Sequence, residues 1–380
     1  MTGKNFLAFA GFAAVLLIAG VWLSAHRANE QADIGGGAVF TDLKPALGDI
    51  TEIRFSKGDG SRTTLKRGAG GWTVVERNYP ADGAKVRELA LNVAAMKVVE
   101  PKTSDPANYA KLGVEPADSP TATSTLVEVV SAKKTWSLLV GKSAEGRAVY
   151  VRKPQDKTSA LAEPSVSVDP DQKRWVDRQI TDLAGADVHD IAVTPAKGPA
   201  YLLTRAKRGD ADLALSPVPK GRNPATSMSL DGQGEVLAAF NFDDVHPLEN
   251  PAPATTDKAV WRTFDGQVLE FAGRRTGDKA FVTVTAHRDA ALAAQFAAAA
   301  AAKTGDAKPP EPKPAAQTVE RLGARATGVQ YEIPGYKYDA LFKPLEDLLE
   351  KPPAPPAKPA AMAKPDKKPQ QPSAKPATPR

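Results

Sequence analysis

The longest apolar stretch of the chain covers Phe6–Ala25, which contains 20 residues and no charged side chain. A helix rises about 1.5 Å per residue, so this stretch would reach roughly 30 Å, the thickness of the hydrocarbon core of a bilayer. The alternative is a cleavable signal peptide, whose apolar core has about 7–15 residues. Here the stretch is longer, and bulky Leu23 stands where a cleavage site needs a small residue. We therefore expect an uncleaved signal anchor, with residues 1–25 forming a short cytoplasmic head and a transmembrane helix.

The charges beside this anchor favour neither orientation strongly, because Lys4 precedes it and His26 and Arg27 follow it. The head before the anchor is too short to be a domain. We therefore expect a single-pass protein of the cell inner (cytoplasmic) membrane, with its body on the periplasmic or extracytoplasmic side.

A first β-rich module is predicted over residues 47–165, after a linker over residues 26–46. Short segments of alternating apolar and polar residues predict an antiparallel meander at residues 50–55, 63–66 and 72–75. The period then becomes helical: Asp82 is a suitable N-cap, and apolar residues recur at helical spacing from Val86 to Met96. Further strands are predicted at residues 125–130, 135–140 and 148–152.

The second half of the chain repeats this pattern. Residues 49–55 resemble residues 187–193, with apolar positions in register, and residues 201–204 take the place of the second strand. Closing strands are predicted at residues 260–264, 267–271 and 280–285. The repetition indicates an internal duplication, with a second β/α module over residues 185–350. Chance similarity between short strands is the alternative, since the identity is low.

Helical segments are predicted to connect and close the two modules. Asp169-Pro170-Asp171 begins a helical connector over residues 166–184. Residues 289–302 are rich in alanine, which favours a helix, and they open an Ala/Pro-rich insertion near residues 289–316. A last helix at residues 338–350 carries its apolar residues on one side. The predicted fold class is α+β: one N-terminal transmembrane helix, two related modules of antiparallel β-meander with packed helices, and a disordered C-terminal tail.

The composition of that tail explains most of the positive net charge of the chain. Residues 351–380 are mostly Ala, Pro and Lys, so they lack the apolar residues needed for a core and are expected to be disordered. Residues 352–380 hold six basic side chains against one acidic side chain, a balance of +5, whereas the whole chain carries +6. The rest of the chain is therefore nearly neutral, and we expect no nucleic-acid partner.

Candidate chemistry is sparse. The chain has no cysteine, which excludes disulfides, thiolate metal sites and cysteine nucleophiles. Its four histidines do not have the spacing of metal ligands: His26, His189, His246 and His287. Asp243-Asp244 before His246 could hold a cation, but neighbouring carboxylates point different ways on most backbones. A solvated loop is the favoured interpretation of this segment.

Other motifs have structural explanations. Gly141-Lys142-Ser143 resembles the end of a phosphate-binding loop, but the earlier glycine is missing and a strand precedes it, which favours a turn. Asp169 and Asp171 are explained by helix capping. Four tryptophans could stack on sugars, although strand positions favour core packing: Trp72, Trp136, Trp175 and Trp261. The sequence therefore predicts no catalytic residue, no metal site and no cofactor.

Several motifs together are similar to the domain-of-unknown-function 4340 family. They are Gly70-Gly71-Trp72-Thr73-Val74, Tyr79-Pro80-Ala81-Asp82, the element from Tyr109 through Leu112-Gly113 to Pro116, Val140-Gly141-Lys142 with the strand that ends at Arg152, and Trp175-Val176-Asp177-Arg178. The similarity is best over residues 50–183, and Gly335-Tyr336-Lys337-Tyr338 also resembles the family. The alanine-rich insertion and the long tail depart from its pattern.

The resemblance implies an accessory function and no catalytic activity. Members of this family are typically membrane-anchored envelope proteins, often encoded beside an ABC-2 type permease, its ATPase and a gliding-motility-type auxiliary subunit. By this similarity the chain would be a non-enzymatic accessory component that contacts the permease or the auxiliary subunit. The family has no established catalytic residues to carry over. Two alternatives remain: a module that binds peptidoglycan or an anionic glycan through the basic tail, and an unrecognised hydrolase.

Overall fold

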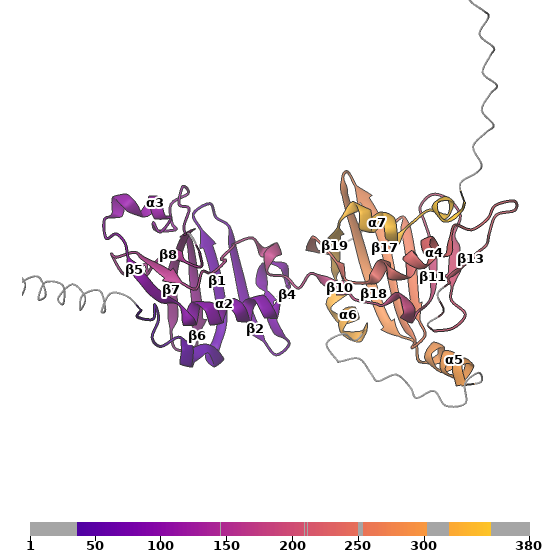
Figure 1. Cartoon of the computed structure of the whole chain (residues 1–380), viewed down its shortest axis with the longest axis horizontal. Helices are drawn as coiled ribbons and strands as arrows, with labels where there is room; N and C mark the ends of the chain where they lie inside the picture. Colours follow the sequence, from indigo (N-terminus) through magenta and orange to yellow (C-terminus); the bar gives the residue numbers. More distant parts are fainter. Residues whose placement is uncertain are drawn as a thin grey trace, which may run out of the picture.

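The computed structural model describes residues 36–144, 146–208, 210, 212–249, 254–301 and 319–350. These residues form two large antiparallel β-sheets with short helices packed on them, which confirms the predicted α+β class (Figure 1). Within the described ranges, no helix is both long and apolar enough to cross a membrane. The predicted anchor at Phe6–Ala25 and the predicted tail at residues 351–380 lie outside them.

The first sheet has nine strands in the order β4-β3-β2-β1-β6-β7-β8-β9-β5. Their bounds are β1 Ile50–Lys57, β2 Arg62–Gly68, β3 Gly71–Val74, β4 Tyr79–Pro80, β5 Lys97–Pro101, β6 Thr125–Ser131, β7 Thr135–Ser143, β8 Val149–Arg152 and β9 Ala160–Glu163. Helix α2 (Gly83–Ala95) begins as predicted, because the Asp82 carboxylate accepts hydrogen bonds from the N–H groups of Ala84 and Lys85. Its apolar face is buried in the core of the first module.

The second sheet has eight strands in the order β13-β12-β11-β16-β17-β18-β19-β15. Their bounds are β11 Val188–Thr194, β12 Tyr201–Thr204, β13 Ala214–Ser216, β15 Asp244–Pro247, β16 Asp257–Thr263, β17 Gln267–Thr276, β18 Lys279–Arg288 and β19 Val329–Ile333. The helices of this half are α4 Ser227–Gly234, α5 Ala290–Ala301, α6 Val319–Ala326 and α7 Gly335–Leu341.

The two sheets have the same strand order apart from β4, an additional edge strand of the first sheet. In each sheet the chain runs from a central strand to one edge, crosses by way of a helix to the far edge, and returns to pair with the central strand. The central strands β1 and β11 also carry a register shift at equivalent places, between Ile50 and Glu52 and between Val188 and Asp190. These positions coincide with the sequence match between residues 49–55 and residues 187–193.

The predicted helical connector is largely wrong. Only the 3₁₀ helix η4 (Gln172–Arg174) is helical, and the chain then runs into β10 (Gln179–Thr181), which pairs with β14 (Phe240–Asn241). The segment is extended because it is bound on both sides: the N–H of Asp177 donates to the carbonyl of Pro80, and β10 pairs with a strand of the second half.

The last predicted helix, at residues 338–350, is interrupted. Helix α7 ends at Leu341, and the 3₁₀ helix η8 covers Leu345–Leu348, because Pro344 cannot continue a helix from the preceding turn. Leu341, Leu345 and Leu348 are nevertheless buried.

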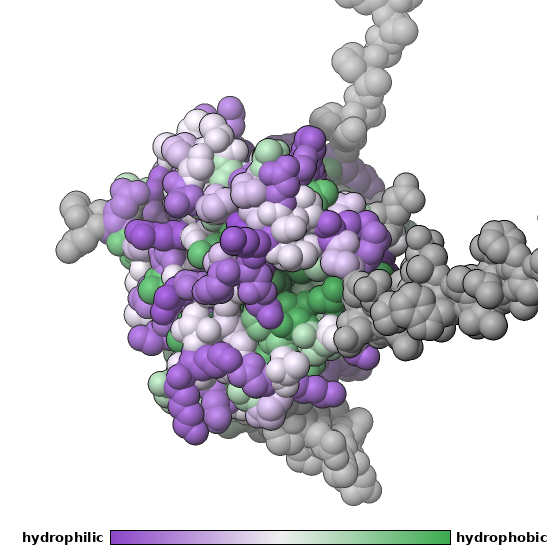
Figure 2. Space-filling model, turned by 90° about the vertical axis from the view of Figure 1, so that its left-hand side faces the viewer, coloured by the Kyte–Doolittle hydropathy of each residue, from purple (hydrophilic) through white to green (hydrophobic). Residues whose placement is uncertain are grey.

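The linker predicted over residues 26–46 also ends earlier than expected. Val39, Phe40 and Leu43 are buried in the first core, and residues 36–39 hydrogen-bond along the outer side of β5. Figure 2 shows this end of the first module: its surface is mainly hydrophilic, with one hydrophobic hollow. The first module therefore begins before η1 (Lys44–Asp49).

Two family-like motifs form one packing unit in the first module. Gly141 lies within β7 and not in the predicted turn, and an added Cβ there would collide with the carbonyl oxygen of Leu112 and with Gly113. Beside them, the guanidinium of Arg152 lies 4.3 Å from the centroid of the Tyr109 ring. Gly141 thus lets the Tyr109–Leu112 helix (α3) approach the sheet.

Gly141→Ala is therefore expected to lower the free energy of unfolding by about 2 kcal/mol, because the new methyl group meets backbone that cannot move aside. Urea unfolding of the full chain measures the change. Gly70→Ala is the matched control, since an added Cβ there has no neighbour within 4 Å. Equal stability of the two variants would mean that α3 does not pack tightly on β7.

Candidate functional site

Three aromatic side chains pack together where the two modules meet. They are Tyr79 of β4, Phe242, which directly follows β14, and Tyr331 of β19. Each is at most 1% exposed. The Tyr79 and Tyr331 hydroxyl oxygens are 3.2 Å apart and share a hydrogen bond, and both rings lie against Phe242. Burial raises the pKa of both phenols, so they are neutral at the junction. The apolar residues of the two modules thereby form one continuous core.

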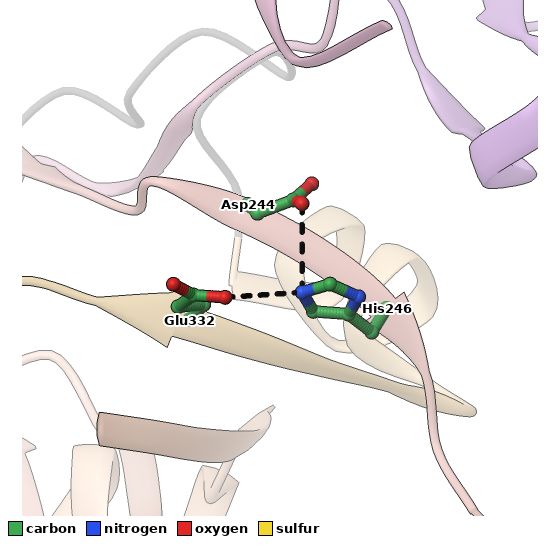
Figure 3. Close-up of side chains that lie close together, drawn as sticks. All are labelled: Asp244, His246 and Glu332. Atoms are coloured by element: carbon green, nitrogen blue, oxygen red, sulfur yellow. Dashed lines mark hydrogen bonds and ion pairs between the residues drawn. The ribbon is translucent and has the colours of Figure 1, made fainter. Parts of the chain in front are cut away.

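A cluster of ionisable side chains lies close in sequence to these aromatic residues, since Asp244 follows Phe242 by two positions and Glu332 follows Tyr331 directly. Figure 3 shows its three members, Asp244, His246 and Glu332. Asp244 and His246 are two residues apart on β15 and point to the same face, and Glu332 on β19 stands directly opposite Asp244. His246 Nε2 lies 3.3 Å from Glu332 Oε2 and 3.5 Å from Asp244 Oδ2. Two carboxylates and an imidazole at this spacing are a ligand set for a divalent cation.

The carboxylates of the cluster already have cationic partners. Asp244 Oδ2 lies 3.1 Å from Arg77 Nη2 and 3.2 Å from Lys173 Nζ, and Asp244 Oδ1 accepts the N–H of Val245. Lys279 Nζ lies 2.9 Å from Glu332 Oε2.

A divalent cation would displace these ion pairs and meet three basic side chains. The geometry therefore favours an ion-pair network that joins the modules, since Arg77 belongs to the first module, Lys173 to the connector and Asp244 to the second module. Removal of one partner from such a network leaves the others desolvated and uncompensated.

Further bonds fix the connector in this junction. Arg325 of α6 donates to the carboxylate of Asp177 at 2.9 Å and to the carbonyl of Ile180 at 2.7 Å. Arg178 Nε donates to the carbonyl of Phe242 at 2.8 Å. The extended connector is thus bonded to the second module by side chains as well as by the β10–β14 pair.

The acidic pair Asp243-Asp244 was expected in a solvated loop, and this is wrong for Asp244. Asp244 is 1% exposed and lies in β15, where it forms the ion pairs with Arg77 and Lys173. Asp243 is exposed and pairs with Arg178 at 2.9 Å instead. The structure therefore separates the two neighbouring carboxylates, as expected from their backbone, and buries one of them.

Glu332 gives the cluster a pH dependence. Partial burial favours a higher pKa for this carboxyl, but hydrogen bonds from Lys279 and His246 and the charges of Lys279 and Lys173 outweigh it and hold the pKa below its usual range. A carboxyl with a lowered pKa stabilises the fold above the pKa of the unfolded chain, about 4.3, and this stabilisation is lost as the pH falls through the folded pKa.

We therefore expect Glu332→Gln to lose less stability than the wild type when the pH is lowered from neutral to below about 4.3. Urea unfolding at the two pH values measures the difference. Glu88→Gln is the control, because Glu88 is exposed and has no bonded partner among the described residues. Identical pH dependence in Glu332→Gln and the wild type would contradict the role of Glu332.

The other described histidines, His189 and His287, lie outside this cluster. His189 Nδ1 lies 2.8 Å from Asp190 Oδ2, and its ring packs against Phe296 at a centroid distance of 4.0 Å. His287 is exposed at the end of β18, and His26 lies outside the described residues. Of the candidate residues named from the sequence, the described structure brings together Asp244 and His246.

Three of the four tryptophans pack in the core, as predicted: Trp136, Trp175 and Trp261. Trp72 is half-buried and lines a surface groove. Asp171 caps η4 by accepting the N–H of Lys173, which confirms its structural role.

Sequence patterns did not reveal Glu332, Arg77, Lys173 or Lys279. Arg77 is 167 positions from Asp244, and Glu332 is 86 positions from His246. No periodicity or motif connects residues so far apart. The pairing of β15 with β19 and the docking of the two modules bring them together.

Comparison with known proteins supports the family resemblance. Neither a curated protein nor a solved structure matches the chain. Residues 72–259 match the family described as Domain of unknown function (DUF4340). The matched range begins at Trp72 in β3, includes Tyr79 and Asp244 of the junction, and ends in β16. Over residues 72–259 the chain therefore belongs to the DUF4340 family, as its sequence motifs predict.

Proposed function

We propose that this chain is a membrane-anchored envelope protein and a non-enzymatic accessory component of an ABC-2 type transport system. In this proposal Phe6–Ala25 holds it in the inner membrane as a single-pass protein, and its body lies on the periplasmic or extracytoplasmic side. The family resemblance and the length of the apolar segment support the proposal. Its partners would be the permease or the auxiliary subunit.

The fused junction is the structural observation that carries this proposal. Tyr79, Phe242 and Tyr331 join the cores of two sheets whose strand orders match apart from β4, and the ion pairs of Asp244 reinforce the contact. A body without hinge motion loses less conformational entropy when it binds a partner. We infer that the two modules arose by internal duplication and that their fusion provides a preorganised contact surface.

Copurification from membranes tests the proposal. The full chain carries a C-terminal affinity tag and is expressed with the permease, ATPase and auxiliary subunit encoded nearest to it, and the membranes are solubilised in mild detergent. We expect the permease or the auxiliary subunit to elute with the tagged chain. The control is a fusion of the same first 35 residues to an unrelated exported domain, which should elute alone. A full chain that also elutes alone after chemical crosslinking would contradict the accessory role.

A second candidate function is binding of an anionic envelope polymer by the basic tail. The observation that favours it is the concentration of charge: residues 352–380 carry +5 of the total of +6. Binding to purified peptidoglycan should then weaken when salt is raised from about 0.05 M to about 0.5 M, because screening shortens the range of charge attraction. Deletion of residues 352–380 should abolish the binding and leave the stability of the body unchanged. Unchanged binding after the deletion would reject this candidate.

A further inference from the structure

A groove of about 540 Å³ opens beside the junction, where α2 lies. Its apolar lining includes Leu47, Trp72 and Leu91, of which Trp72 is half-buried and Leu91 is 50% exposed. Arg321 of α6, in the second half of the chain, lines the same groove. Both modules therefore contribute to this surface, and its shape depends on the junction that fuses them.

The basic residues that line the groove are not neutralised by its acidic residues. Its two acidic residues already have partners: Asp82 pairs with Lys85 at 3.2 Å, and Asp177 pairs with Arg325 at 2.9 Å.

Its basic residues have few partners. Arg87 and Arg321 are exposed and form no hydrogen bond or ion pair with any other described residue. Arg67 donates to the carbonyl of Gly48 at 3.0 Å and pairs with no described carboxylate. The groove thus combines an apolar wall with guanidinium groups that have no anionic partner among the residues the structure describes.

We propose that this groove binds a segment of a partner protein in which an aliphatic or aromatic side chain is flanked by aspartate or glutamate. The apolar side chain would bury against Trp72 and Leu91, and the carboxylates would pair with Arg87 and Arg321. Guanidinium and carboxylate groups match in a two-pronged geometry, and Trp and Arg are common centres of binding energy in interfaces.

Charge complementarity favours an acidic partner segment over the basic tail of this chain as the ligand of the groove. The basic tail of this chain has the same sign as the groove arginines, so it is a poor occupant. An acidic and apolar segment satisfies both parts of the surface. The proposal names the chemistry of the partner, and it rests on the proposed function in taking the partner to be a protein.

Peptide binding to the detergent-solubilised full chain tests the proposal. The probes are a fluorescent twelve-residue peptide with central Leu and Trp residues flanked by Glu, and the same peptide with Gln in place of each Glu. We expect saturable binding of the Glu peptide, with an affinity at least about tenfold higher than that of the Gln peptide, corresponding to about 1.4 kcal/mol. Fluorescence anisotropy measures both affinities.

Surface variants locate the binding. The double variant Arg87→Glu/Arg321→Glu should weaken binding of the Glu peptide at least about tenfold, and Leu91→Ser should weaken both peptides. These side chains are exposed, so the fold should be unaffected. Arg147→Glu is the matched control, because Arg147 is exposed, lies outside the groove lining and has no described side-chain partner; it should bind like the wild type.

Several results would overturn the proposal. They are absence of saturable binding, equal binding by the wild type and the double variant, or tighter binding of phosphatidylglycerol vesicles than of the peptide at the same arginines. Self-association of the chain that disappears in the double variant would assign the groove to a second copy instead.

Copurification separates this proposal from the accessory function. Copurification that persists in the double variant rejects the groove alone. Its absence in the wild type rejects the accessory role, whatever the peptide result.

Discussion

Tyr331→Ala is expected to lower the free energy of unfolding by about 3–5 kcal/mol, the cost of removing a large buried aromatic side chain. Tyr331 is 0% exposed, packs against Phe242 at a centroid distance of 5.0 Å, and shares its hydroxyl hydrogen bond with Tyr79. The cavity would open between the modules, so it should weaken their coupling as well as the second core. Urea unfolding with circular dichroism measures the loss.

Tyr336→Ala is the matched control, because Tyr336 is 71% exposed and lies in the same part of the chain. Its effect should stay within about 0.5 kcal/mol. A loss for Tyr331→Ala no larger than that of Tyr336→Ala would mean that the aromatic contact does not join the modules in solution.

Asp244→Ala should cost about 3 kcal/mol, because it leaves two cations at the junction without their shared partner. The Asp244 side chain is 2% exposed, whereas Arg77 and Lys173 are 21% and 44% exposed. Solvent therefore screens part of the loss, and the cost stays below the upper end for a fully buried pair. Chemical unfolding of the variant beside the wild type gives the value.

Two comparisons separate an ion-pair network from a metal site. Asp243→Ala should change stability by at most about 0.5 kcal/mol, because the side chains of Asp243 and its partner Arg178 are both nearly half exposed. Addition of Zn²⁺ or Mn²⁺ should leave the melting temperature of the wild type unchanged. An Asp244-dependent rise in melting temperature on addition of either ion would instead assign the cluster to metal binding.

Much of the sheet structure was predictable because alternation is a local signal. The strand predictions at residues 50–55 and 63–66 and the Asp82 cap depend on neighbours within a few residues, and all three are found. The very short strands β4 (Tyr79–Pro80) and β14 (Phe240–Asn241) have two residues each and carry no alternation that a pattern can detect. The sequence therefore indicates the central strands better than the edges.

The connector shows where local signals mislead. Asp171 does cap a helical turn, but the helix ends after Arg174 because the following residues find partners outside their own segment. Trp175 stacks on Phe55 at a centroid distance of 4.7 Å, and Asp177 bonds to Arg325. Tertiary contacts of this kind override helix propensity and cannot be read from spacing.

The charged cluster could be predicted only in part for the same reason. Asp244 and His246 are close in sequence and were named, whereas Glu332 and the three basic partners come from other elements. The compensating charges decide what the cluster does, and they are the part that the sequence does not reveal. From the sequence alone a solvated loop is favoured here, and neither the burial of Asp244 nor its basic partners could be foreseen.

That the two modules form one rigid body is tested most directly by a distance measurement between them. The chain has no cysteine, so spin labels attach at engineered positions only, one on the β6–β7 hairpin (Lys133→Cys) and one on the β17–β18 turn (Asp278→Cys). Both positions are exposed. Double electron–electron resonance should give a single narrow distance distribution, which Tyr331→Ala broadens. A broad or two-peaked distribution with the junction intact would show that the modules move independently and would contradict the account.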